Sequence, residues 1–498
     1  MTLLHHVALA LAAAALGGAG VRVAGCIGAR GLEVVVAGAP VAAAAAVLWA
    51  LGLGIAGLGG SPIALLVSAG LTWGAARVLL PDHDPPRRCL ATWWGEAALG
   101  TRAGVAAASA AALAVCAWQL RHPYLSLDAL TYHLGLPGAW VHDGSPGAVA
   151  AVFEGLPVGN YPVTHEVLIA WAIGLSRSWV VASIISPALA ALLVAAAWTG
   201  LRALDVPRLI AGLAAAAFLV LPLTATQLGG PLTDLPATVW LGVVASLVGL
   251  SFRGPRPLLL VPALLAAGLS VGTKTTPVML LALILGFGAW RQRAALRPLA
   301  APLAGGAVVA LLLCAVWPIR NLIEHGSPLW PFVATPFGDP VPPKLAPLRT
   351  SFLDHPGVML DGRLGAYAEM LAGGLVLFPA AIVLPLVRRS RAALALGAAS
   401  ALGFLLWMAA PYTGIDSTVL ALDTTRYLLP TLLACTAAIA VSSRGAPPRL
   451  RAAVAAILGL ALIVSLVRTL NIGFPAVPAT ATALAAAGLG AGAALLVG

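Results

Sequence analysis

Residues 178–201 read SWVVASIISPALAALLVAAAWTGL, an apolar run without a single charged side chain. About 20 apolar residues in an α-helix cross the ~30 Å hydrocarbon core of a bilayer, and a helix satisfies its own backbone hydrogen bonds there. The run therefore predicts a transmembrane helix. Similar runs recur along the whole chain, so the same interpretation extends outward from this segment in both directions.

The composition excludes a soluble protein. Of the 498 residues, 60% are hydrophobic and 9% are charged, and the mean hydropathy is +0.98. Soluble domains carry about 25% charged residues. We expect an all-α polytopic membrane protein with about 15 transmembrane helices. The predicted spans are 4–21, 33–55, 61–80, 103–120, 178–201, 207–224, 235–252, 257–272, 275–290, 300–317, 371–388, 392–410, 425–443, 450–467 and 480–497.

The arginines predict the orientation of these spans. If the loop 81–102 is cytoplasmic, 19 of the 28 basic residues lie inside and nine lie outside. An excess of basic residues in cytoplasmic loops is the usual bias of membrane proteins. Twelve of the 17 acidic residues fall on the outer side, so we expect any chemistry to be extracytoplasmic. The formal charge of +11 is spread in short clusters between apolar runs, which argues against a nucleic-acid partner.

The predicted organisation has three parts. Residues 1–102 hold N-terminal transmembrane helices and a cytoplasmic loop, 103–445 form the catalytic transmembrane core, and 446–498 are C-terminal transmembrane helices. Two large outer loops fall at about 121–177 and 318–370. Counting 161–176 as a span would invert every later loop, so this segment predicts an interfacial helix lying along the membrane.

Charged and polar side chains recur at the outer ends of the predicted helices. An ionisable residue at a membrane edge is costly, which makes each one a candidate functional residue. A carboxylate can act as general base on a hydroxyl, and cations can neutralise a departing phosphate. The candidates are the catalytic acids Asp128 and Asp234, and the substrate-binding residues Tyr132, His133, Lys274, Arg320, Asn321, Arg426 and Tyr427.

The order of several motifs resembles the GT-C superfamily of integral-membrane glycosyltransferases. The first outer loop of that superfamily is similar to Asp128-x-x-x-Tyr132-His133 followed by Tyr161-Pro162, and its second acidic loop is similar to Thr233-Asp234-Leu235-Pro236. The segment Gly268-Leu269-Ser270-Val271-Gly272-Thr273-Lys274 resembles the Gly-rich lysine hairpin of the superfamily. Two further motifs resemble stretches common in its bacterial members: Trp317-Pro318-Ile319-Arg320-Asn321 with Gly326-x-Pro328-x-Trp330-Pro331, and Arg426-Tyr427-Leu428-Leu429-Pro430. The chain departs from the simplest layout of the superfamily in having three predicted helices before the one that leads into Asp128.

The resemblance implies a function. Members such as the protein O-mannosyltransferases and aminoarabinose transferases move a sugar from a polyprenyl phosphate to an acceptor, and their first-loop acid is the catalytic base, which corresponds to Asp128. The expected activity is hexosyl or pentosyl transfer to a hydroxyl of a glycan, glycolipid or protein, with inversion. No cofactor is expected, and a divalent metal at Asp128 and His133 is the alternative. Of the basic residues, 26 are arginine, which with the Ala and Gly content suggests a bacterial plasma membrane.

Each candidate also has a structural interpretation. Asp128 and Asp234 are acceptable helix N-cap residues. Lys274 is able to snorkel at a helix end, and Arg320 and Arg426 can pair with Glu324 and Asp423. His165 and Glu166 are interpreted as loop-packing groups. The alternative functions are a transporter or flippase of lipid-linked sugars, which would show broken helices and charges at mid-bilayer, and a non-catalytic scaffold of the same fold.

Overall fold

The computed structural model describes residues 2–81, 86–123, 125–152, 156–254, 256–361, 363–414 and 424–471. Every regular element in these ranges is a helix, as predicted from the composition. Contacts divide the chain into two compact units, and each unit combines three separate segments. Unit 1 comprises Met1–Ala97, Leu125–Ala196 and Gly230–Pro342, and unit 2 comprises Ala98–Tyr124, Ala197–Gly229 and Pro343–Gly498.

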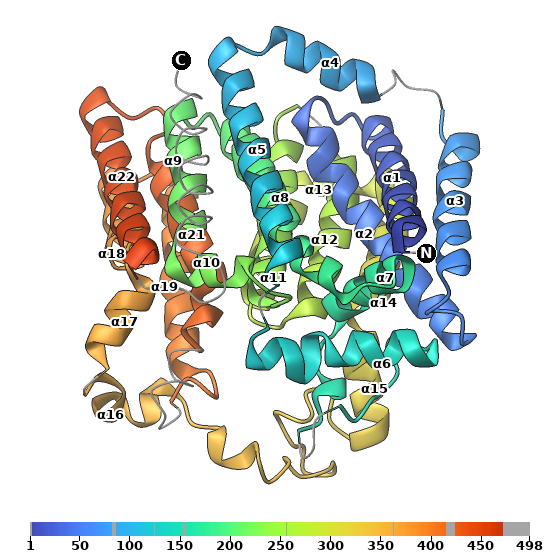
Figure 1. Ribbon diagram of the computed structural model, residues 1–498. Coiled ribbons are helices and arrows are strands. Elements are labelled where there is room, and N and C mark those ends of the chain that lie inside the picture. The colour runs from blue at the N-terminus through green and yellow to red at the C-terminus, as the bar shows by residue number, and fades with distance from the viewer. Residues whose placement is uncertain are drawn as a thin grey trace. The chain divides into compact units, whose positions relative to one another are not determined.

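Unit 1 holds seven of the nine predicted site residues, all except Arg426 and Tyr427, and Figure 1 labels its helices. Its main helices are α1 (Thr2–Cys26), α2 (Leu32–Ile55), α3 (Pro62–Leu79), α4 (Pro86–Glu96), α6 (Gly135–Asp143), α7 (Thr164–Ser176), α11 (Asp234–Ser251), α12 (Leu260–Thr273), α13 (Val278–Leu296), α14 (Ala300–Cys314) and α15 (Val316–His325). The helix α8 (Ala182–Ala203) begins in this unit.

Unit 2 holds the remaining long helices. They are α5 (Leu99–Arg121), α9 (Arg208–Leu219), α10 (Pro222–Leu228), α16 (Pro356–Leu360), α17 (Leu364–Leu371), α18 (Gly374–Arg388), α19 (Arg391–Ala409), α21 (Leu429–Ser442) and α22 (Pro448–Asn471). A 3₁₀ turn, η8 (Thr425–Leu428), precedes α21.

The described residues contain nine helices that are long and apolar enough to cross a membrane. The number rises to as many as eleven if each of two sharply bent helix pairs is one span. The protein is thus a multi-pass membrane protein, while the predicted count of about 15 is not confirmed. The predicted span 480–497 lies outside the described residues.

The apolar run Val278–Cys314 is a hairpin rather than one long helix. Gly306 on α14 packs against Val261, and Ala310 packs against Gly268, seven residues further toward the end of α12, so α14 runs parallel to α12. On α13, Gly288 packs near Leu260 at the start of α12, so α13 runs antiparallel to it. The chain therefore reverses at η5 (Arg297–Leu299), in agreement with the two spans predicted there.

The prediction of an interfacial helix at 161–176 is wrong in its placement. The helix forms as α7, but all of its residues except Leu168 are buried, against α1, α2, α3, α6 and α12. An interfacial helix keeps one polar face in water, and α7 has no such face. His165 and Glu166 lie in the first turn of α7, so two ionisable groups are buried in the interior of unit 1.

The helix with an interfacial pattern is α15. Ile319, Leu322 and Ile323 share one face at a spacing of three and four residues, and all three are exposed. The opposite face carries Arg320 and Asn321, and Asn321 is buried. Since α15 directly follows α14, whose Leu311 and Leu312 are also exposed, its apolar face continues a surface suited to lipid.

The first outer loop is held against the turn between α2 and α3. The amide of Gly59 donates to the carbonyl of Gly144 over 2.9 Å. Gly144 ends α6 with a left-handed φ of 72° and approaches the backbone of Gly57 so closely that a Cβ would collide with it. Both conditions favour glycine, so the local sequence fixes where α6 lies.

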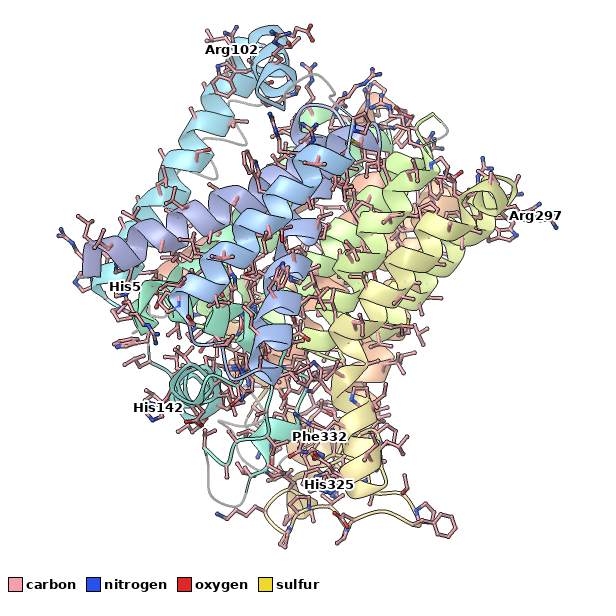
Figure 2. The ribbon with its side chains drawn as sticks, turned by 90° about the vertical axis from the view of Figure 1, so that its right-hand side faces the viewer. His5, Arg102, His142, Arg297, His325 and Phe332 are labelled. Carbon is pink, nitrogen blue, oxygen red and sulfur yellow. The ribbon has the colours of Figure 1, made fainter. Side chains whose placement is uncertain are left out.

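Four ion pairs each join residues that the sequence predicts on the same side of the membrane. Glu33 pairs with Arg256 at 2.6 Å and Asp205 with Arg444 at 3.3 Å, and all four were assigned to the inside. The pairs between Asp234 and Lys274 and between Glu369 and Arg468 join residues assigned to the outside. Within unit 1, Arg297 lies at the opposite end from His142, His325 and Phe332 (Figure 2).

Candidate functional site

Asp128 stands at the start of a π-helical turn, η1 (Ala129–His133). Ser126 Oγ accepts a hydrogen bond from the Ala129 amide over 3.1 Å, and Thr131 Oγ1 donates to the Asp128 carbonyl over 3.3 Å. Asp128 occupies the N-cap position of this turn, but its carboxylate makes no capping hydrogen bond. The structure therefore does not support the interpretation of Asp128 as a helix cap. Single π turns occur frequently at functional sites, and Asp128 is half-buried there.

The same turn brings His133 to Glu166. His133 Nδ1 lies 2.6 Å from Glu166 Oε1, and the two side chains are 2% and 1% exposed. This contact joins η1 to the first turn of α7, 33 residues further along the chain. A histidine paired with a buried carboxylate has a fixed ring orientation, so the pair holds the π turn and its neighbour Tyr132 in place.

His165 lies beside this pair without a hydrogen bond of its own. Both ring nitrogens are buried and have no partner among the described residues. Burial lowers the pKa of His165 to about 4, the nearby His133 adds to this lowering, and Glu166 opposes it. The ring is therefore neutral at physiological pH.

The metal alternative at Asp128 and His133 gains no support from the geometry. In the described part of the chain, no three His, Cys, Asp or Glu side chains are grouped so that they could hold a metal ion. The Nδ1 atom of His133 faces Glu166.

Asp234 and Lys274 form an ion pair between the start of α11 and the end of α12. Lys274 Nζ lies 2.6 Å from Asp234 Oδ1, and the Asp234 side chain is 2% exposed. The N-cap of α11 is Thr233, so Asp234 occupies the first turn and is not the cap. A carboxylate in the first turn is favoured by the helix dipole, and Lys274 extends from the end of α12 to meet it.

The first turn of α7 connects these two pairs. Gly272, two residues before Lys274, has no side chain and packs directly against the side chain of Thr164. Thr164 Oγ1 also donates to the Leu313 carbonyl over 2.7 Å and accepts from Trp317 Nε1 over 2.9 Å. The neighbours of Thr164 along α7 are His165 and Glu166. The π turn after Asp128 and the hairpin that carries Lys274 therefore contact the same helical turn.

An aromatic row extends from the π turn to the second outer loop. The ring of Tyr132 lies 5.8 Å from that of Tyr161, in an edge-to-face arrangement, and Tyr161 lies 4.7 Å from Phe332. Such ring pairs add to the stability gained from burial. The row therefore links both outer loops beside Asp128.

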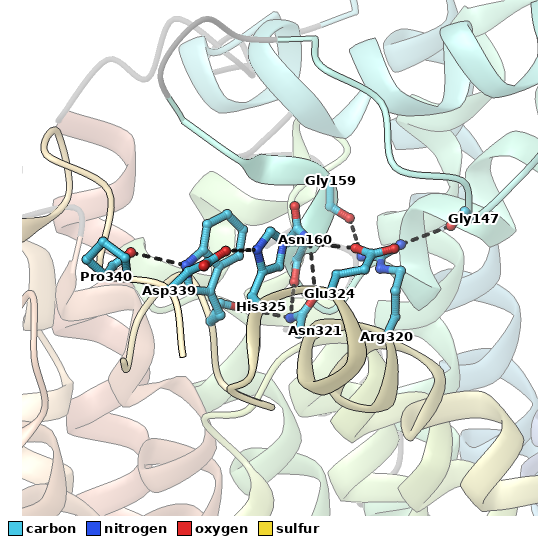
Figure 3. A network of polar contacts seen from close by, with 10 residues as sticks. Gly147, Gly159, Asn160, Arg320, Asn321, Glu324, His325, Asp339 and Pro340 are labelled. Carbon is cyan, nitrogen blue, oxygen red and sulfur yellow. Dashed lines mark hydrogen bonds and ion pairs between the residues drawn. The ribbon is translucent and has the colours of Figure 1, made fainter. Parts of the chain in front are cut away.

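Arg320 and Asn321 bind the first outer loop (Figure 3). The guanidinium of Arg320 donates to the carbonyls of Gly147 and Gly159, and burial lowers its pKa. Asn321 Nδ2 donates to the carbonyls of Asn160 and Trp330 over 2.8 and 2.7 Å. These contacts give both residues a structural role, and their predicted role in substrate binding stays a prediction.

Arg426 and Tyr427 belong to unit 2, in η8. The preceding carbonyl of Thr424 accepts a hydrogen bond from Trp407 Nε1 over 3.0 Å, which holds η8 to α19. Asp423, the alternative partner proposed for Arg426, lies outside the described residues. The structure thus gathers the predicted residues of unit 1 in one region, while those of unit 2 remain a separate prediction.

The sequence interpretation missed the contribution of Asn160 and assigned Glu166 only to packing. A signal for Glu166 existed, because an ionisable residue inside an apolar segment is a candidate functional group by default. No local signal existed for Asn160, whose partner Asn321 is 161 residues away.

Comparison with models of known protein families, with curated proteins and with solved structures found no match. The class of protein therefore follows from the chain itself. It is a multi-pass membrane protein, all-helical in the residues that the structure describes, with buried ionisable pairs in unit 1.

Proposed function

We propose that the protein is a GT-C-type glycosyltransferase that moves a sugar from a polyprenyl phosphate to an acceptor hydroxyl on the extracytoplasmic side of a bacterial plasma membrane. The observation that carries the proposal is the ion pair of Asp234 and Lys274, in contact through α7 with the turn that follows Asp128. A carboxylate and an ammonium group at one helix end suit a reaction in which a proton is taken up and a phosphate leaves.

The reaction is a single displacement. Asp128 takes the proton of the acceptor hydroxyl, the acceptor oxygen forms a bond to the anomeric carbon, and the bond between that carbon and the phosphate oxygen breaks. Attack from the face opposite to the leaving group inverts the anomeric centre. The polyprenyl phosphate departs as an anion.

Lys274 suits the role of binding the departing phosphate. An ammonium group has three N–H donors, and Lys274 Nζ lies 2.6 Å from Asp234 Oδ1. Asp234 holds the ammonium group in position at the end of α12, where a cation can neutralise the charge of a departing phosphate. Arg426 is the second proposed phosphate ligand. The acceptor is a glycan, glycolipid or protein of the cell envelope.

The test uses the purified protein in lipid nanodiscs with decaprenyl-phosphate-linked hexoses and pentoses, and a cell-envelope extract as acceptor. Release of decaprenyl phosphate reports turnover. We expect Asp128→Asn to lower turnover by at least about 100-fold with an unchanged melting temperature. The matched control is Asp143→Asn, an exposed acid of the same loop, which should keep full activity. Full activity of Asp128→Asn would reject Asp128 as the base.

A specific observation favours the alternative of a transporter for lipid-linked sugars. Unit 2 contains two helix pairs that bend by 69° and 76°, and broken helices are a feature of transporters. Proteoliposomes with a fluorescent decaprenyl-phosphate sugar and no acceptor distinguish the two functions. Movement of the intact lipid across the bilayer, unaffected by Asp128→Asn, would favour transport over transfer.

A further inference from the structure

The two bends of unit 2 leave backbone groups that need partners. One bend separates α9 from α10 at residues 220–221, and the other separates α17 from α18 at residues 372–373. A helix that breaks within a membrane frees amide and carbonyl groups, and each free group is costly unless another part of the protein binds it.

One face of α22 supplies both partners. Ser465 Oγ accepts a hydrogen bond from the Gly373 amide over 3.1 Å, and Thr469 Oγ1 donates to the Val220 carbonyl over 3.0 Å. Residues four apart on a helix lie about 6 Å from each other on the same face. The two bends therefore lie side by side against a single turn of α22.

Glycine at position 373 makes this close contact possible. A Cβ there would collide with the carbonyl of Ala461 and with the Ser465 hydroxyl. The sequence therefore encodes this bend, because it combines a glycine at position 373 with the Ser465 hydroxyl that binds the glycine's amide.

Polar side chains without partners lie on the two short helices at these bends. On α10 they are Thr224 and Gln227, and on α17 it is Tyr367; their exposures are 0%, 2% and 6%. Thr224 Oγ1, Gln227 Oε1 and Tyr367 Oη have no hydrogen-bond partner among the described residues. The helices α10 and α17 contact each other, and both contact η8.

Leaving these three groups without partners is expensive. A buried polar atom that lacks a hydrogen bond costs the protein about 1–3 kcal/mol. Three of them on adjacent helices indicate that something outside the protein chain binds them.

We propose that the paired bends of unit 2 form a binding site for the sugar hydroxyls of a membrane glycolipid. The threonine and tyrosine hydroxyls can donate or accept, while Gln227 Oε1 can only accept. A ligand that satisfies all three groups must therefore carry hydrogen-bond donors of its own, as the hydroxyls of a sugar are. A fully ionised phosphate offers only acceptor oxygens, and one of them facing Gln227 Oε1 would be repelled.

The position of the site among membrane-spanning helices indicates that its ligand is a lipid. Both bent pairs and α22 are apolar enough to cross a membrane, so a ligand reaches this part of unit 2 from the bilayer. The residues of the site belong to unit 2, whereas Asp128 and Lys274 belong to unit 1, and the proposal does not depend on the reaction proposed there.

The experiment measures the melting temperature of the full-length protein in nanodiscs of phosphatidylglycerol. The additions are monoglucosyl diacylglycerol, diacylglycerol without sugar, or free glucose. We expect the glucosyl lipid to raise the melting temperature by a few degrees and diacylglycerol to have no effect. A response to free glucose alone would keep the sugar site and reject the lipid source.

The variants Thr224→Val and Tyr367→Phe remove the hydroxyls with little change of shape. We expect each to weaken binding of the glucosyl lipid about tenfold and to raise the melting temperature without lipid, because an unsatisfied polar atom is lost. The control is Thr226→Val on the same helix, whose hydroxyl already donates to the Leu223 carbonyl over 3.0 Å. Absence of any lipid effect on the wild type, with variants less stable than it, would overturn the proposal and indicate bound water only.

Discussion

Asp234 and Lys274 show how strongly a buried charge depends on its partner. The carboxylate of Asp234 is 2% exposed, and the ammonium group of Lys274 lies 2.6 Å from it. Removing the ammonium group leaves an unpaired buried charge. We expect Lys274→Met to lower the free energy of unfolding by about 3 kcal/mol.

The double variant Asp234→Asn/Lys274→Met should regain most of that loss, because no unpaired charge remains. Denaturant unfolding in detergent micelles, followed by tryptophan fluorescence, measures both. The control is Lys344→Met, the other lysine of the chain, which is exposed. Equal destabilisation by the single and double variants would mean that the ion pair contributes little.

His165 makes stability depend on pH. Burial lowers its pKa in the folded protein from 6.5 to about 4. Below about pH 6.5 the unfolded chain binds a proton that the folded protein does not, so stability falls as the pH drops from 6.5 toward 4 and is constant above about 7. The full loss is about 3 kcal/mol.

The variant His165→Leu should remove this part of the pH dependence. Melting temperatures at about pH 7.5 and about pH 5 provide the measurement, with His142→Leu as a control because His142 is exposed. An unchanged slope in His165→Leu would assign the pH dependence to other groups.

At the scale of elements, α15 acts as a clamp on the first outer loop. Asn321 Nδ2 donates to two backbone carbonyls, which fixes Oδ1 toward the side chain of Asn160, 3.1 Å away. Asn160 in turn contacts His325 Nε2 at 3.2 Å, and His325 Nδ1 lies 2.8 Å from Asp339 Oδ2. The two outer loops are therefore held by one continuous hydrogen-bond network.

We expect Asn321→Leu to release this clamp. Loss of the amide leaves two buried carbonyls without a donor, at a cost of about 2 kcal/mol. Hydrogen exchange should rise at residues 147–152, 156–160 and 326–340, and Asp361→Asn, at an exposed acid, should leave it unchanged. Protection equal to that of the wild type in Asn321→Leu would show that the loops are held by other contacts.

Local patterns predicted some elements and missed others for a physical reason. The spacing of Ile319, Leu322 and Ile323 makes α15 amphipathic, a property visible in the sequence alone. The helix α7 was found but placed at the interface, because its burial depends on a partner, His133, that is distant along the chain. The pairing of Asp234 with Lys274 could be predicted from the sequence, because both residues were expected at the outer ends of helices.

At the scale of the whole molecule, the grouping of loops onto a common side was easier to predict than the number of spans. Charge bias is a local property of each loop, and all four ion pairs described above join residues predicted on the same side. The bends in unit 2 are not local. They are stabilised by Ser465 and Thr469 on α22, more than 90 residues after Gly373 and about 250 after Val220.

The orientation itself is open to a direct test, because a reversed protein would place the same pairs together on the wrong sides. A cysteine at Phe337, which is 99% exposed, should react with a membrane-impermeant maleimide in intact cells. A cysteine at Ala294, near the reversal at Arg297, should react only after permeabilisation. Both are introduced into a chain whose five cysteines are replaced by serine. Since 19 of 28 basic residues predict the cytoplasmic side, labelling of position 294 alone in intact cells would invert the topology and place Asp128 away from an extracytoplasmic acceptor.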